Sequence, residues 1–179
     1  NRDDWTYDFS EKCIEKKFRY ESTEINKLIE QKNNSYPATI KWSNTLKTKF
    51  LKGIKASFNR EYIIKSQFRP FSLKYYFADK YWNDRLTQNH YDIFGNKFDK
   101  QNICFSFNGV GMDKTFHIIA TKYLPHLQLT PNGHCVSLYY YDEAGNRIDN
   151  ITNWGLEQFT THYKDKKIKK EDIFHYTYA

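Results

Sequence analysis

The residues with the clearest chemistry are basic ones in a segment that lacks carboxylates. Between Glu30 and Glu61 the chain has no acidic residue and seven basic ones. These are Lys32, Lys41, Lys47, Lys49, Lys52, Lys55 and Arg60. An uncompensated positive field of this kind suits phosphate groups, although a solvated lysine surface has the same composition. Charge alone therefore makes nucleic acid a candidate partner without deciding the question.

The segment 41–55, KWSNTLKTKFLKGIK, also predicts the helix that would position these charges. Ser43 is a typical N-cap residue, and Gly53 suits a C-terminal stop. The apolar residues have the spacing of one buried stripe: they are Leu46, Phe50, Leu51 and Ile54. At about 100° per residue, most of the lysines lie away from this stripe, and Lys47 would have to extend past it.

Residues 65–90 interleave basic and aromatic side chains, a pattern typical of nucleic-acid surfaces. A sheet edge with an aromatic core would give the same pattern, and Arg69 and Arg85 could instead pair with Asp79 or Asp84. We predict phosphate contacts from Lys41, Ser43, Lys47, Lys49, Lys52, Lys55, Lys65, Arg69 and Lys114. We predict base contacts from Asn83, Arg85, Gln88, Asn89, His90 and Asn108, because these residue types read base edges.

The glycine-containing run at 107–111, FNGVG, resembles the cofactor loop of adenine-N6 DNA methyltransferases. Such enzymes also need an Asn/Asp-Pro-Pro-Tyr/Phe loop, and the four prolines of this chain stand singly. A glycine turn at a strand end is therefore the favoured interpretation. A backbone phosphate nest assisted by Lys114 is the intermediate one.

Other catalytic and metal-binding patterns are missing from the sequence. The three Cys and six His contain no pairs at zinc-ligand spacing, and only His134 and Cys135 are adjacent. Cys104 and Cys135 lie in apolar runs that disfavour a thiolate. No G-x-S-x-G motif and no nuclease-type carboxylate cluster ending in lysine occurs. We therefore expect no catalytic centre and no metal in this chain.

Composition limits the class of protein. The chain has 179 residues and a net charge of +7, which favours acidic partners such as nucleic acid. An aromatic content of 18% excludes a disordered basic tail. Three widely spaced cysteines argue against a disulfide framework. There is no signal peptide and no apolar run of membrane-spanning length, so we expect a cytoplasmic protein without membrane contact.

Periodicity predicts an α+β fold, a mostly antiparallel sheet with helices at both ends of the chain, in a single domain. One or two helices are expected over 9–31, and further helices at 43–55, at 153–163 (capped by Thr152) and from 170. Asp8 and Glu11 could form a capping box at the first of these. Strands are expected at 72–78, 102–107, 115–120, 128–130 and 135–141. Residues 1–8 and 39–42 are predicted to be extended, 88–100 to be a polar loop, and 58–66 is ambiguous between helix and strand.

The order of several short blocks resembles the C-terminal specificity domain of Type ISP restriction-modification enzymes. The blocks are NRDDW (1–5), IKWS (40–43), KSQFRPF (65–71), NDR (83–85), FNGVG (107–111), NITNW (150–154) and EDIFHY (171–176). They cover nearly the whole chain, and R-P-F and N-I-T-x-W are the most specific. In this alignment FNGVG lies in the specificity domain, which argues further against a cofactor loop.

The resemblance implies a target recognition domain, residues 1–179, excised from a longer chain, with 1–35 a helical lead-in from the methyltransferase side. The parent would combine nuclease, helicase and adenine-N6 methyltransferase domains. The partners would be double-stranded DNA and other domains of the same chain. S-adenosylmethionine, ATP and Mg would belong to the parent, with no cofactor in this segment. Two alternatives remain: a basic module that docks onto the parent's own domains, and an S-adenosylmethionine-binding methyltransferase fragment.

Overall fold

The computed structural model describes residues 2–109, 115–130 and 133–179. Its contacts divide into two compact units. The first unit, here the N-terminal unit, contains residues 1–66 and 73–86. The second, here the C-terminal unit, contains residues 67–72 and 87–179. The boundary passes through a β-hairpin, whose tip belongs to the C-terminal unit.

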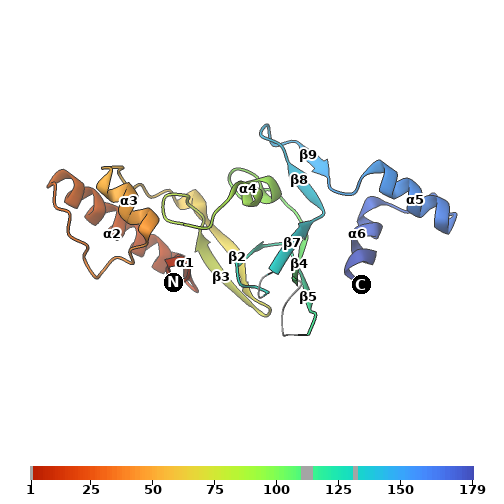
Figure 1. The fold of residues 1–179 in the computed structure, drawn as a ribbon, viewed down its shortest axis with the longest axis horizontal. Helices are drawn as coiled ribbons and strands as arrows, with labels where there is room; N and C mark the ends of the chain where they lie inside the picture. Colours follow the sequence, from red (N-terminus) through yellow and green to blue (C-terminus); the bar gives the residue numbers. More distant parts are fainter. Residues whose placement is uncertain (1, 110–114, 131–132) are drawn as a thin grey trace. The chain divides into compact units, whose positions relative to one another are not determined.

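The N-terminal unit is built on α2 (Glu11–Glu30), which follows the short α1 (Arg2–Trp5) and precedes α3 (Asn44–Leu51) (Figure 1). Ser10 caps α2, because its Oγ accepts a bond from the Cys13 amide at 3.4 Å. The expected capping box is wrong: Asp8 Oδ1 instead accepts from the Ser10 amide at 3.1 Å. Ser43 caps α3 as predicted, accepting from the Leu46 amide at 3.1 Å.

Aromatic packing forms the core of the N-terminal unit. Phe18 of α2 is fully buried, and its ring centroid lies 4.5 Å from that of Phe77 and 5.0 Å from that of Trp82. Leu46 and Phe50 of α3 join the same cluster. The predicted stripe of α3 is only half right, because Leu51 and Ile54 are 58% and 47% exposed.

Four strands form one sheet in the order β1-β3-β2-β6. Their bounds are β1 (Tyr7–Asp8), β2 (Ile63–Arg69), β3 (Ser72–Phe77) and β6 (Leu124–Pro125). β1 pairs antiparallel with β3, with Tyr7 opposite Tyr76. A single 3₁₀ turn, η1 (Arg60–Tyr62), precedes β2, so the ambiguous segment 58–66 contains both states.

The C-terminal unit contains a three-stranded antiparallel sheet of order β5-β4-β7 and the antiparallel pair β8-β9. Their bounds are β4 (Cys104–Asn108), β5 (Ile118–Thr121), β7 (Gly133–Ser137), β8 (Tyr139–Tyr141) and β9 (Arg147–Asp149). The helices are α4 (Gln88–Phe94), α5 (Asn153–Tyr163) and α6 (Lys170–Tyr178). Phe105, Leu138 and Phe174 form the core, and Thr152 caps α5 as predicted.

The α+β class, the antiparallel pairing and the helices at both ends of the chain are confirmed. Several local predictions are wrong. Residues 88–94 form α4 instead of a loop, 128–130 form no strand, and 2–5 are helical. Residues 38–40 turn instead of extending, with the Ile40 amide bonded to the Pro37 carbonyl. The run 135–141 is divided at Leu138 between two sheets.

Asn102 stabilises the chain where the run 135–141 is divided between β7 and β8. Its side-chain amide donates to the carbonyls of Ile93 and Tyr139, each at 2.7 Å, and its Oδ1 accepts from the amides of Ile103 and Tyr139. We expect Asn102→Ala to lower the free energy of unfolding by about 2–4 kcal/mol, since it leaves buried backbone groups unbonded. Urea denaturation followed by circular dichroism measures this. A loss below about 0.5 kcal/mol would show that the bonds are dispensable.

Candidate nucleic-acid interface

Some of the predicted phosphate-binding residues are held by bonds that stabilise the fold, and others are exposed to solvent. Ser43 belongs to the first group. Its Oγ accepts from the Leu46 amide and donates to Asp84 Oδ1 at 2.9 Å. Because the hydroxyl hydrogen is used by Asp84, Ser43 is better placed to join α3 to the loop after β3 than to bind a phosphate.

Lys49 is also used within the fold. Its Nζ donates to the carbonyls of Lys80 and Tyr81, both at 2.8 Å, and lies 5.2 Å from the centre of the Tyr81 ring. Burial lowers the pKa of Lys49, while the nearby Asp84 and Asp79 oppose that shift. The predicted phosphate contact from Lys49 does not fit this placement, because its ammonium closes the 80–81 turn onto α3.

The remaining lysines of the segment 41–55 lie at or near the surface, as a phosphate contact requires. Lys41 and Lys52 are exposed, and the Nζ of half-buried Lys47 lies 4.8 Å from the centre of the Tyr36 ring. Lys55 is exposed but forms an ion pair with Glu30 at 2.9 Å. An exposed pair of this kind is weak and can exchange for a phosphate. Lys41, Lys47 and Lys52, here the outer lysines, are therefore the strongest candidates in this segment.

Lys65 of β2 is exposed, whereas Arg69 is held in place. The guanidinium of Arg69 donates to the Phe68 carbonyl at 2.7 Å, lies 3.1 Å from Nδ1 of His126, and sits over the Phe68 ring. The expected alternative pairing of Arg69 with Asp79 or Asp84 is not what the structure shows. The prediction for Lys114 lies outside the described residues, as do Val110 and Gly111 of the glycine-containing run.

Two predicted base-reading residues are buried instead. Asn83 is 5% exposed and donates to the carbonyls of Phe77 and Asp79, which stabilises the chain turn after β3. Asn108 is 7% exposed; it donates to the Thr115 carbonyl and accepts from the His117 amide. It thereby joins the end of β4 to residues 115 and 117. Neither side chain can reach a base edge as placed, because both are buried and both side-chain NH2 groups donate to backbone carbonyls.

The other predicted base-reading residues lie near the start of α4. Arg85, Gln88 and Asn89 are exposed, and Gln88 donates to Asp92 at 2.9 Å. Asn89 and His90 line a pocket of about 480 Å³. The remaining lining residues are Thr87, Ile93, Phe94, Phe107, Leu124, Pro125, Gly133, His134, Cys135 and Val136. Sequence reasoning missed His134 as a polar residue of this pocket, because it comes from β7, far along the chain.

His90 makes the stability of the fold depend on pH. Its Nδ1 lies 3.1 Å from the Thr87 amide, and burial lowers the pKa of His90, opposed by a bond to the Thr87 carbonyl. The unfolded chain therefore takes up a proton before the folded one does, at about pH 6.5. Stability is full above that pH and falls as the pH drops through 6.5 towards the lower pKa of the folded state.

We therefore expect the melting temperature to fall on acidification from pH 7 to 5, with a contribution from His90 of at most about 1.4 kcal/mol per pH unit. The comparison is Tm against pH for the wild type and for His90→Gln. The variant should show a flatter profile. An identical slope would remove His90 as the cause.

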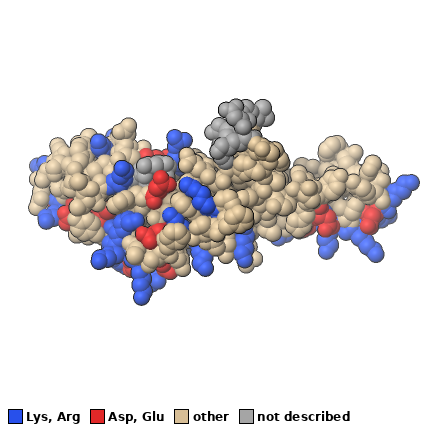
Figure 2. All heavy atoms as spheres, turned by 90° about the horizontal axis from the view of Figure 1, so that it is seen from below, with Lys and Arg blue, Asp and Glu red and all other residues tan. Residues whose placement is uncertain are grey.

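Positive charge is distributed rather than concentrated on the face drawn in Figure 2. Lysines and arginines lie among acidic residues over the N-terminal helices and over the C-terminal helices. Among the described residues, no group of three or more His, Cys, Asp or Glu could hold a metal ion. No described helix is long and apolar enough to cross a membrane.

Comparison with known proteins identifies the class. A family model described as the Type ISP C-terminal specificity domain matches residues 1–179. The chain therefore belongs to this family, as the sequence blocks predicted. No curated protein matches it.

Three solved structures are similar. A chain of a cryo-electron microscopy DrdV–DNA complex is 31% identical, with a TM-score of 0.88 over 99% of this chain and 18% of that one. The ATP-dependent Type ISP restriction-modification enzyme LlaBIII bound to DNA is 21% identical, with a TM-score of 0.80 over 99% and 12%. A nuclease-deletion mutant of the Type ISP enzyme LlaGI, in complex with a DNA substrate mimic, is 21% identical, with a TM-score of 0.72 over 85% and 16%. The chain thus spans less than a fifth of each solved chain.

Proposed function

We propose that this chain recognises a specific sequence in duplex DNA, within a restriction-modification enzyme, and places a target adenine for a neighbouring N6-methyltransferase domain. The observation that carries the proposal is the family match over residues 1–179. The fold similarity to a chain of the DrdV–DNA complex supports it. The adenine would leave the base stack for the methyltransferase pocket, which costs a few kcal/mol.

Within this function, phosphate contacts and base contacts have separate tasks. The outer lysines, with Lys65, would bind phosphates and position the protein without reading sequence. Arg85, Gln88 and Asn89 would supply base contacts, because they are exposed and carry the donors and acceptors that base edges match. Asn83 and Asn108 would instead hold the backbone.

The cofactors of the reaction would bind outside this chain. LlaBIII is described as ATP-dependent, and we propose S-adenosylmethionine, ATP and Mg for the longer enzyme. All three would bind to other domains of that enzyme. Because the substrate would be DNA, the cytoplasm is the proposed location.

The test is fluorescence anisotropy of the chain with random-sequence duplex DNA, from about 50 to 300 mM salt. Each phosphate contact contributes about −0.9 to the slope of log K against log salt. We expect a slope corresponding to several contacts. Absence of binding at about 50 mM salt would contradict the proposal.

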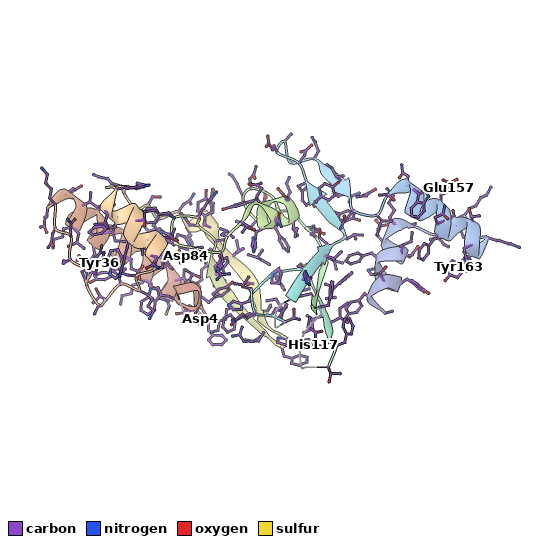
Figure 3. All side chains as sticks on the ribbon, in the orientation of Figure 1. Asp4, Tyr36, Asp84, His117, Glu157 and Tyr163 are labelled. Atoms are coloured by element: carbon purple, nitrogen blue, oxygen red, sulfur yellow. The ribbon has the colours of Figure 1, made fainter. Side chains whose placement is uncertain are left out.

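A second candidate function, docking onto other domains of the same chain, is favoured by α5. This helix has no buried residue, and its Trp154 and Tyr163 are 70% and 51% exposed. Tyr176 of α6 is 63% exposed. Figure 3 labels Tyr163 at the end of α5. Exposed aromatic residues are enriched at protein interfaces. Trp154→Ala should then weaken activity of the longer enzyme while DNA binding by this chain stays unchanged.

A further inference from the structure

Phe71 is the most exposed large apolar side chain among the described residues. Its relative exposure is 102%, the value of a side chain without neighbours. The next, Phe9, is 71% exposed, and Lys74 Nζ lies 4.6 Å from the centre of its ring. Isolated exposed apolar residues are common on proteins, so exposure alone indicates no function.

The turn that presents Phe71 is braced. Pro70 and Phe71 form the two-residue connection between β2 and β3, and neither has a positive φ. The Gln67 side chain donates to the carbonyls of Arg69 at 2.8 Å and of Pro70 at 3.2 Å, and accepts from Thr121 Oγ1 at 3.2 Å. Since the proline ring also fixes its own φ, Phe71 is held outward by a pre-organised backbone.

Three further contacts hold the strand that leads into the turn. The Arg69 guanidinium bonds the Phe68 carbonyl and approaches His126, and the His126 amide donates to the Gln67 carbonyl at 2.9 Å. These bonds keep the tip from folding back to bury the phenyl ring. Exposure of an apolar side chain to water is unfavourable, and these bonds hold Phe71 in that exposed position.

The hairpin is also free of negative charge. Between Glu61 and Asp79 the chain has no acidic residue, but it has Lys65, Arg69 and Lys74. A basic ribbon with an apolar tip fits one surface in particular: an anionic backbone that encloses apolar, stacked rings. Duplex DNA has both features.

We propose that Phe71 is a wedge that inserts between two adjacent base pairs of duplex DNA. The proposal rests on the proposed function and adds one residue and one mode of contact to it. Inserted apolar side chains partly unstack a base step and kink the duplex, and the cost is offset by added contact with the protein.

The test uses duplexes selected from a random library by the wild-type protein. Each base step across the selected site is labelled in turn with 2-aminopurine, whose fluorescence rises when stacking is lost. We expect the wild type to raise the fluorescence at one step. Phe71→Ala should abolish that rise and weaken binding about 10-fold, the scale of one lost stacking contact. The slope of affinity against salt should stay the same, because phosphate contacts remain.

Two variants serve as controls. Phe71→Leu keeps an apolar wedge and should retain most of the fluorescence rise. Phe9→Ala removes another exposed phenylalanine and should change neither signal. Equal fluorescence profiles for the wild type and Phe71→Ala, with DNA binding intact, would overturn the wedge but leave the proposed function standing. A wild type that binds no duplex would overturn both, and Phe71 would then belong to a protein contact.

Discussion

Replacing the outer lysines with glutamine, as Lys41→Gln, Lys47→Gln and Lys52→Gln together, is expected to reduce DNA affinity roughly 100- to 1,000-fold at about 0.1 M salt. Each phosphate contact contributes about 0.9 to the log–log salt slope, so three lost contacts lower the slope by about 2.7. Lys41 and Lys52 are exposed, and Lys47 is half-buried with its Nζ over the Tyr36 ring. Anisotropy titrations at four or more salt concentrations measure both quantities.

A matched variant separates local contacts from net charge. Lys164, Lys166 and Lys167 are exposed and lie in the C-terminal unit. Replacing these three with glutamine removes the same charge and should change affinity much less. Equal losses from both triple variants would mean that overall charge, and not the segment 41–55, attracts the DNA. Lys49→Gln is expected to lower stability instead, since Lys49 bonds two carbonyls within the fold.

Phe18→Ala is expected to lower the free energy of unfolding by about 3–5 kcal/mol. Phe18 is 0% exposed and contacts both Phe77 and Trp82, so its loss leaves a cavity where α2 packs against the rest of the N-terminal unit. A cost of this size is comparable with the whole stability of many domains. Urea denaturation followed by tryptophan fluorescence reports it, because Trp82 is a neighbour.

Phe9→Ala is the matched control for this prediction. The same side chain is removed from the same unit, but Phe9 is 71% exposed. Its effect should stay within about 0.5 kcal/mol. If the two variants were equally destabilised, the core described for this unit would be wrong.

Sequence reasoning succeeded where the signal is local. Ser43 and Thr152 were predicted as helix caps because an N-cap hydroxyl bonds an amide three residues away, and both bonds are present. The long helix α2 was predicted from its apolar period. The strand expected at 72–78 is confirmed as β3 (Ser72–Phe77).

The failures have physical reasons too. The prediction of a loop at 88–100 is wrong over α4 because this helix buries only Phe94 and so has no apolar period in its sequence. The division at Leu138 has no sequence signal: it depends on bonds from Asn102 and on the Leu138 amide bonding the Ile103 carbonyl, 35 residues away. Residue type alone could not place these partners.

The candidate interface was the least predictable part. Lys49 and Lys52 look alike in sequence, yet one is bonded to carbonyls at positions 80 and 81 and the other is exposed. Asn83 and Asn89 differ in the same way, since one is buried and the other is not. The type of a side chain indicates that it could contact DNA. Whether it is available for that contact depends on its bonds and burial in the folded protein.

The most direct test of the central claim is a binding competition between a selected duplex and a scrambled one of the same composition. The duplex is chosen by repeated selection from a random library, and the competition is run at about 0.15 M salt. Specific recognition predicts a preference of at least about 1,000-fold for the selected sequence. Equal affinity for both duplexes, or no enrichment of any sequence, would contradict a role in target recognition.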